Sequence, residues 1–280
     1  MVPKFVDNAA PIAREFTRDD INNSLGLLNG LETGYDDAAI KSYRLFAKLK
    51  SEGHINQGVK FQVSLPTVAN VVGVLIEEGF RKEVEPIYEA ALFRALDRIQ
   101  AEIPHTELAI QIDLGMDLAY WEGVLFKPWF DNKEHVVDYV AKMIQKVHVN
   151  VDVGIHYCYG DMDHKHFIEP KSLQSIVDLH QQILKRKTRQ LDWMHCPVPI
   201  SAVDQLDAYL SPLSALLPLS HTRLYLGLIH PRRPEETRKM FEAAKKVVDD
   251  FGVGTECGLG RTPKGDVKSI MDISMELCTQ

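Results

Sequence analysis

The fold is decided by residues 149–197, which contain VNVDVGIHYC (149–158), PKSLQSIVDLHQQILK (170–185) and LDWMHCP (191–197). The first and third runs are short, apolar and rich in β-branched or aromatic residues, and the third ends at a proline, as buried strands do. The middle run carries apolar residues at helical spacing. A strand, a long helix and a second strand predict a βαβ unit, in which the two strands are parallel.

The same alternation extends along the rest of the chain. We predict further strands at 59–66, 108–113, 224–229 and 253–257, and helices at 68–101, 133–147, 234–250 and the C-terminus. This makes six strands, and eight would close a (β/α)8 TIM-type barrel. The missing strands could lie in residues 1–55, whose pattern is mainly helical. We therefore expect an α/β fold, with a single TIM-barrel domain over residues 1–280 and an irregular or incomplete N-terminal part.

Composition excludes several classes of function. The 280 residues are 45% hydrophobic and 25% charged, with a formal net charge of -7, which is ordinary for a globular protein. An acidic chain is not suited to sequence-independent binding of nucleic acid or to anionic membranes. No apolar run approaches the ~18 residues that span a bilayer, and residues 1–14 carry no secretory signal pattern. We expect a cytoplasmic protein that binds neither nucleic acid nor membranes.

Reactive side chains gather where the predicted strands end. In a parallel α/β barrel all strands end on one face, and this face carries the active site. Residues that are far apart in the sequence should therefore meet there. The residues in question are Asp113, His156, Cys158, His195, Cys196, His230, Glu256 and Cys257.

Several of these residue types suit a zinc ion, which prefers thiolate and imidazole ligands. His156 and Cys158 are two apart on a strand, so their side chains point the same way. Cys257 and either His195 or Cys196 could complete the set, and we favour His195 because neighbours on a strand face opposite sides. The alternative is that the cysteines are small buried hydrophobic residues, which is common for free cysteine.

Four motifs resemble the catalytic domain of cobalamin-independent methionine synthase. They are HYC (156–158), LGLIHPR (226–232), ECGLGR (256–261) and AIQID (109–113), and the similarity runs weakly from about residue 59 to 262. That superfamily also contains uroporphyrinogen decarboxylase and coenzyme M methyltransferases, and its members are TIM-type barrels. The resemblance implies that His156, Cys158 and Cys257 bind zinc. It also implies that Asp113 holds the amino group of an amino-acid thiol and that His230 is an acid that assists methyl transfer.

The chain departs from that family at several functional positions. The family's glutamate zinc ligand has no counterpart within 191–197, so His195 or Cys196 replaces it or the site has three protein ligands. The tryptophan expected to stack on folate after residues 59–66 is absent, and Leu114-Gly115 stands where the family has Glu-Pro. These differences predict a divergent, stand-alone member that does not use folate and homocysteine.

The predicted activity is zinc-dependent transfer of a methyl or other alkyl group to a thiol bound at the metal. Its partners would be a small-molecule thiol and an alkyl donor, with the oligomeric state left open. Two thiolates and two imidazoles leave a zinc site neutral, whereas replacing one imidazole by a carboxylate makes it negative. The neutral site makes a bound thiolate less nucleophilic, which favours a donor more reactive than a folate amine. His230 would be the general acid or base, and Asp113 would orient the substrate.

Other residues are candidates for binding the substrate. Asp161 and His164 lie on the polar loop 159–166, which should line the mouth of the barrel. Arg232 and Arg261 follow predicted strands and could hold an anionic substrate. The main alternative activity is a zinc-dependent hydrolase or lyase that acts on a small carbonyl or carboxylate substrate. A third possibility is a binding protein in which the metal is structural.

Overall fold

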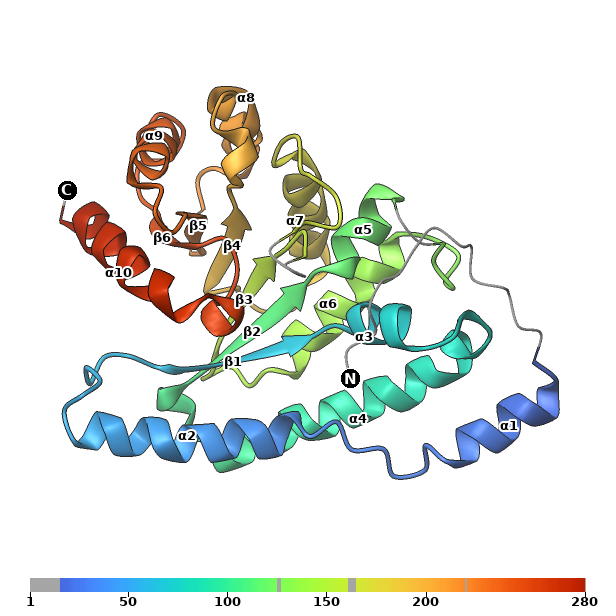
Figure 1. The fold of residues 1–280 in the computed structure, drawn as a ribbon. Coiled ribbons are helices and arrows are strands. Elements are labelled where there is room, and N and C mark those ends of the chain that lie inside the picture. The colour runs from blue at the N-terminus through green and yellow to red at the C-terminus, as the bar shows by residue number, and fades with distance from the viewer. Residues whose placement is uncertain (1–15, 125–126, 161–164, 220, 280) are drawn as a thin grey trace.

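Six parallel strands form one sheet, in the order in which they occur in the chain (Figure 1). The structure is a computed structural model that describes residues 16–124, 127–160, 165–219 and 221–279. Every pairing within the described residues joins two strands that are consecutive in the sequence, as βαβ units require. The strands are β1 (Phe61–Pro66), β2 (Leu108–Leu114), β3 (Asp152–Tyr157), β4 (Trp193–Pro197), β5 (Arg223–Ile229) and β6 (Gly252–Thr255).

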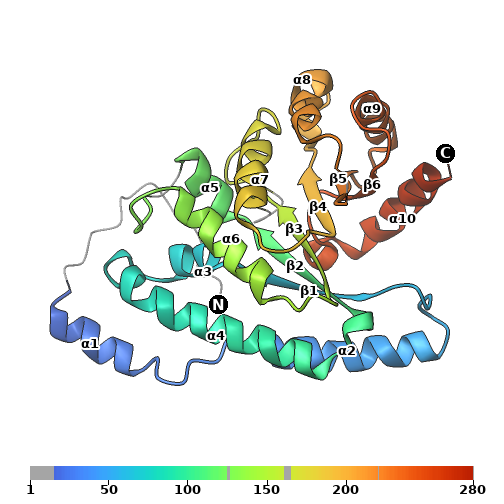
Figure 2. The ribbon, with the colours of Figure 1, turned by 180° about the vertical axis from the view of Figure 1, so that it is seen from behind.

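The helices lie around the sheet and pack on one another (Figures 1 and 2). Contacts join α2 to α4, α4 to α6 and α6 to α7, and they also join α8 to α9 and α9 to α10. A short 3₁₀ helix, η3 (Ile200–Ala202), follows β4. The α-helices are α1 (Arg18–Gly26), α2 (Tyr35–Ser51), α3 (Val68–Leu75), α4 (Arg81–Glu102), α5 (Met116–Glu122), α6 (Glu134–Lys146), α7 (Gln174–Arg186), α8 (Leu206–Leu210), α9 (Pro234–Lys245) and α10 (Lys264–Cys278).

The two faces of the sheet differ in polarity. On β2 the alternate residues Leu108, Ile110 and Ile112 are fully buried and belong to the main hydrophobic cluster. Gln111 and Asp113 alternate with these residues along the strand and are only partly buried. Because successive side chains on a strand point to opposite faces, the sheet packs its apolar face against helices and leaves a polar face on the other side. Asp113, His156 and His195 are register partners on this polar face, whereas Cys196 lies in the hydrophobic cluster.

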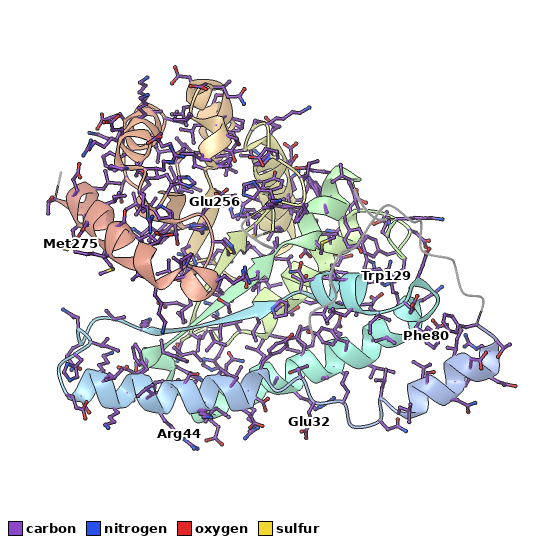
Figure 3. All side chains as sticks on the ribbon, in the orientation of Figure 1. Glu32, Arg44, Phe80, Trp129, Glu256 and Met275 are labelled. Carbon is purple, nitrogen blue, oxygen red and sulfur yellow. The ribbon has the colours of Figure 1, made fainter. Side chains whose placement is uncertain are left out.

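The helices are amphipathic, as a layer that covers a sheet must be. On α6, Val136 and Val140 are fully buried, whereas Lys142 lies at the surface and pairs with a glutamate on α4. Arg44 on α2 and Met275 on α10 point away from the sheet (Figure 3). Within the described ranges, no helix has both the length and the apolar character needed to cross a membrane.

The predicted α/β class and parallel sheet are confirmed, but the sheet is not closed. In the part of the chain that the structure describes, no pairing joins β1 to β6. The N-terminal segment that could have held further strands forms the helices α1 and α2 from residue 18 to residue 51. The arrangement is compatible with a TIM-type barrel, but the described residues form an open six-stranded sheet rather than the closed eight-stranded form. The single domain over residues 1–280 stays a prediction.

Candidate metal centre

Three candidate side chains stand in a row across the carboxyl ends of β2, β3 and β4. Asp113 is the register partner of His156, and His156 is the register partner of His195. In a parallel pair, register partners project to the same face of the sheet. Residues separated by about forty positions in the chain (Asp113 and His156, His156 and His195) are therefore neighbours in space, as the strand-end argument predicted.

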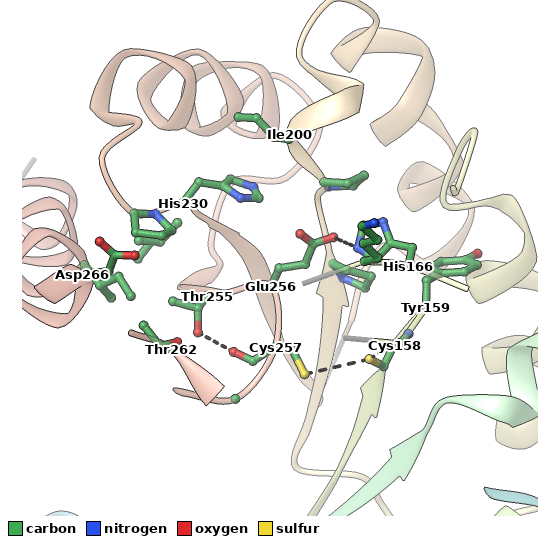
Figure 4. Close-up of a pocket in the computed structure, with 18 of the residues that line it drawn as sticks. Cys158, Tyr159, His166, Ile200, His230, Thr255, Glu256, Cys257, Thr262 and Asp266 are labelled. Atoms are coloured by element: carbon green, nitrogen blue, oxygen red, sulfur yellow. Dashed lines mark hydrogen bonds and ion pairs between the residues drawn. The ribbon is translucent and has the colours of Figure 1, made fainter. Parts of the chain in front are cut away.

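His156, Cys158 and Cys257 form a compact group of possible metal ligands. One ligand atom from each lies within 4.8 Å of the others, and the two sulfurs are 4.0 Å apart (Figure 4). His156 and Cys158 come from β3 and the residue that follows it, and Cys257 comes from the loop after β6. His156 is buried, and the two cysteines are partly buried. The structure therefore brings these three predicted ligands together.

The two sulfurs lie at hydrogen-bonding distance, and either could be the donor. The contact with Cys158, together with the nearby His156 ring, lowers the pKa of Cys257 well below that of an ordinary thiol. The same contact and burial raise the pKa of Cys158. Cys257 is therefore the more readily ionised thiol of the pair. The backbone N–H of Gly160 also donates to the Cys158 sulfur, at 3.3 Å.

His195 contacts His156 rather than the sulfurs. The Nδ1 atoms of the two rings are 2.8 Å apart, and the His195 ring also hydrogen-bonds to the backbone of Thr255. Burial, reinforced by His156, lowers the pKa of His195 to about 3, so the ring is neutral near pH 7. When its Nε2–H bonds to the Thr255 backbone, the lone pair is on Nδ1, and His156 Nδ1–H donates to it.

This arrangement leaves His156 Nε2 as the ring nitrogen that is free to bind a ligand. The atom is buried and has no hydrogen-bond partner, which is costly for a buried polar atom unless something else binds there. His195 lies outside the group of three ligand atoms, so its predicted role as the fourth ligand stays a prediction, and its observed contact is with His156. Cys196 faces the other way, is fully buried in the hydrophobic cluster, and has its pKa raised by burial.

Asp113 lies beside His156, where the sequence placed it. The Gln111 amide donates to its Oδ1 at 2.7 Å, and Gln62 in turn donates to the Gln111 carbonyl oxygen at 2.9 Å. Burial raises the pKa of Asp113, while His156 and the Gln111 bond oppose the shift. Oδ1 is therefore occupied, and the carboxylate is held in one orientation. Its role in orienting a substrate stays a prediction.

A cavity of about 620 Å³ opens on one side of the two thiols. Cys158 and Cys257 line it, together with His230 and Glu256 (Figure 4). A second cavity, of about 460 Å³, lies on the polar face of the sheet and is lined by Gln62, Gln111, Trp193 and Tyr225, among others. Cys257 lines both cavities. The group of ligand atoms therefore lies between two spaces, each large enough for a small molecule.

Comparison with known proteins finds little. No family model matches the chain, and no curated protein matches it. Among solved structures, the chain is similar to a proposed vitamin-B12 independent methionine synthase from Listeria monocytogenes, with a TM-score of 0.47 and 11% sequence identity. The similarity covers 78% of this chain and 62% of that protein, so the chain spans less than two thirds of its length.

The three side chains fit a zinc ion. Two thiolates bound to one tetrahedral zinc, each at ~2.3 Å, lie roughly 3.8 Å apart, and the sulfurs here are 4.0 Å apart. A disulfide would require about 2.05 Å. The unpartnered His156 Nε2 supplies the nitrogen, and its hydrogen bond to His195 is the kind of contact that orients a ligating histidine.

His230 lines the larger cavity, as predicted for a catalytic residue. Its Nε2 is 2.8 Å from the backbone oxygen of Val198. A carbonyl only accepts, so Nε2 carries the hydrogen, and in the neutral ring Nδ1 carries the lone pair. The predicted role of His230 as the general acid or base stays a prediction.

The sequence did not identify His166 as a site residue. Its Nε2 is 2.8 Å from Glu256 and its Nδ1 is 2.9 Å from Glu169, which also bonds to Ser201 in η3. Burial opposes the charge, but the two carboxylates outweigh it and raise the pKa of His166 to about 9. The imidazolium joins the loop after β3 to the residue that follows β6. Figure 3 shows Glu256 near the ends of β3 and β4.

The remaining predicted residues have mixed outcomes. Asp161 and His164 lie outside the described residues. Arg232 Nε is 2.6 Å from Asp266, and its side chain is 72% exposed. Arg261 Nη2 is 3.8 Å from the Cys257 sulfur. Neither arginine is among the described residues that line the larger cavity, and their predicted role with an anionic substrate stays a prediction.

Proposed function

We propose that the protein transfers a methyl or other alkyl group to a small-molecule thiol held at a zinc ion. His156, Cys158 and Cys257 would bind the metal. Zinc in this position would hold the thiol as a thiolate, which is the nucleophilic form. The observation that carries the proposal is the buried, unpartnered Nε2 of His156 next to two sulfurs 4.0 Å apart.

Three protein ligands suit this role better than four. A catalytic zinc site keeps one position for substrate, whereas a structural site is closed by protein. The described group contains three ligand side chains, and His195 holds the third one in place through its ring. This geometry favours a catalytic role over the structural alternative.

The neighbouring side chains have separate tasks. Asp113 offers a carboxylate beside His156 and would orient an ammonium or hydroxyl group of the thiol substrate. His230, with its lone pair at Nδ1, would accept the hydrogen of the incoming thiol. The two cavities that meet at Cys257 would hold the thiol and the alkyl donor.

Hydrolysis or lyase chemistry is the second candidate, and the His230 tautomer is the observation that favours it. A base at Nδ1 beside a metal site could activate water as well as a thiol. The two activities differ in what they need, because hydrolysis of an activated ester proceeds without a thiol acceptor. The same purified protein can be tested for both.

The experiment uses protein substituted with cobalt(II), whose absorption responds to sulfur ligands. Addition of a small thiol should increase the sulfur-to-cobalt charge-transfer band, and zinc protein should convert thiol and alkyl donor to a thioether detected by mass spectrometry. Cys257→Ser should lose both signals, and Cys278→Ser, at an exposed cysteine far from the site, should keep them. Ester hydrolysis without a thiol, combined with no spectral response to thiols, would contradict the transferase.

A further inference from the structure

Part of the wall of the larger cavity is aliphatic. Four prolines and three isoleucines line it, namely Pro197, Pro199, Ile200, Ile229, Pro231, Pro263 and Ile270. Among the described lining residues there is no asparagine, glutamine, tryptophan or phenylalanine. Tyr159 also lines it, but that ring is 1% exposed and its hydroxyl donates to Glu122. A ligand in this cavity therefore meets aliphatic surface, with no amide to pair with a heterocycle.

Carboxylates outnumber cations among the described residues that line the same cavity. Glu256, Glu169 and Asp266 line it, and the lining cations are His166 and Lys165. Asp266 is paired with Arg232, which is not a lining residue, so the uncompensated negative charge lies at Glu256 and Glu169. His166 is shared between two of the carboxylates, and Lys165 lies on the exposed rim. The group Glu256–His166–Glu169 carries one positive and two negative charges. The interior of the cavity thus favours a cationic ligand over an anionic one.

The imidazole N–H groups that form hydrogen bonds around the cavity already have acceptors. Both N–H groups of His166 are taken by carboxylates. The Nε2–H of His230 donates to the Val198 oxygen. An amine donor needs a proton before it can leave as a neutral amine. A cationic donor whose leaving group departs already neutral does not.

These three observations select one class of donor. We propose that the cavity binds an alkyl sulfonium ion, which delivers its alkyl group toward Cys158 and Cys257. A quaternary ammonium ion is less suitable, because such ions are recognised by exposed aromatic rings, and the described walls contain no exposed tryptophan, tyrosine or phenylalanine ring. The proposal rests on the proposed function, in which the acceptor is a thiol held between the two cavities.

The step balances without a further reactant. A lone pair of the substrate thiolate forms the new carbon–sulfur bond, and the carbon–sulfur bond of the sulfonium breaks. The electron pair of the broken bond stays on the departing sulfur, which leaves as a neutral thioether. The negative charge of the thiolate and the positive charge of the sulfonium cancel, and no proton moves.

Calorimetric titration tests the binding without relying on turnover. Butyldimethylsulfonium should bind the purified protein, and neutral butyl methyl sulfide should bind at least about tenfold more weakly, the effect of roughly 1.4 kcal/mol. Glu256→Gln should reduce sulfonium affinity by a similar factor and leave sulfide affinity unchanged. Glu242→Gln, an exposed substitution on α9 outside the cavity, is the matched control and should have no effect.

Two results would overturn the proposal: equal affinity for sulfide and sulfonium, or sulfonium affinity that Glu256→Gln does not change. If Glu256→Gln does not fold, Glu169→Gln provides the same test, because Glu169 is the other carboxylate partner of His166 and lines the same cavity. The cobalt response to thiols decides the proposed function separately. If the cobalt protein responds to thiols but the cavity does not prefer sulfonium to sulfide, only the sulfonium donor is refuted. If the cavity prefers sulfonium but the cobalt protein does not respond to thiols, only the thiol-binding metal site is refuted.

Discussion

The Nδ1 atoms of His156 and His195 lie 2.8 Å apart, on register partners of adjacent parallel strands. Two imidazole nitrogens this close must share one hydrogen, so one ring donates and the other accepts. When His195 Nε2–H donates to the Thr255 backbone, His195 Nδ1 is the acceptor. In that arrangement the His156 Nε2 lone pair lies on the side of the cysteines. The His195 ring controls the chemistry of the candidate metal centre from outside it.

His195→Ala should weaken zinc binding without abolishing it. Loss of a partner that orients a ligating histidine typically costs about 10- to 100-fold in metal affinity. The measurement is competition for zinc with a chromophoric chelator. Cys196→Ala, on the same strand but in the hydrophobic cluster, should leave zinc affinity unchanged while lowering the free energy of unfolding. Unchanged affinity in His195→Ala would contradict the account.

Cys158→Ser and Cys257→Ser should each remove most of the bound zinc while the far-UV circular dichroism stays that of the wild type. The reason is that each sulfur is one of three ligand atoms within 4.8 Å, whereas the sheet and its helices are held by the hydrophobic cluster. Metal analysis after gel filtration measures the outcome. A double mutant that still carries full metal would show that the ion is bound elsewhere.

Gly227→Ala should disturb the site, because a Cβ there would lie 2.8 Å from His195 Cε1 and 2.8 Å from the Cα of Glu256. The ring or the β6 end must move, and overpacking of this kind costs about 1–3 kcal/mol. Gly254→Ala is the matched control, since its Cβ would meet His195 Nε2 at an ordinary 3.6 Å. Urea unfolding and zinc affinity should both change in the first variant and neither in the second. Equal effects would rule out the close approach as the cause.

The stability provided by His166 should depend on pH. Its folded-state pKa of about 9 lies above the ordinary value of 6.5, so the ion pairs contribute fully below pH 6.5 and are lost as pH rises through 9. The contribution has an upper limit of roughly 3 kcal/mol. The difference in unfolding free energy between wild type and His166→Gln, measured in urea, should therefore shrink between pH 6.5 and 9.5. A difference that is constant over this range would contradict the assignment of charge.

Asp117→Asn should stabilise the protein at high pH. Asp117 is fully buried, its carboxylate accepts from Thr67, and burial raises its pKa to about 7. A carboxyl with a raised folded-state pKa stabilises the fold at low pH, and this stability is lost as pH rises through 7. The asparagine stays neutral, so unfolding midpoints should agree below pH 3.8, diverge as pH rises from 3.8 to 7, and favour Asp117→Asn at pH 8. A variant that is less stable at pH 8 would contradict the raised pKa.

Much of the fold could be predicted from the spacing of apolar residues and from the residues that end strands and helices. The predicted strand 108–113 is β2 (108–114), and the predicted helix 133–147 is α6 (134–146). The predicted helix 68–101 is in fact α3 and α4, with an interruption at 76–80, where the apolar spacing continues although the backbone leaves the helix. The short helices α5 and α8 were not predicted, because five to seven residues give too little periodicity.

The candidate site was predicted in part, for physical reasons. Side chains alternate between the two faces of a strand, which predicts that His156 and Cys158 lie on one side and that His195 and Cys196 lie on opposite sides. The structure shows both arrangements. The same reasoning could not say that His195 would meet the His156 ring rather than a metal, because that depends on distances across the sheet. His166 follows a polar loop without periodicity, so its two carboxylate partners are visible only in three dimensions.

The most direct test of the central claim is the metal content of the purified protein, by mass spectrometry under native conditions, for wild type and Cys257→Ser. The account predicts about one zinc per chain in the wild type and its loss in the variant, with the wild-type metal protecting Cys158 and Cys257 from alkylation. Wild-type protein that carries no metal after purification without chelators, and whose two cysteines are alkylated freely in the presence of added zinc, would contradict it.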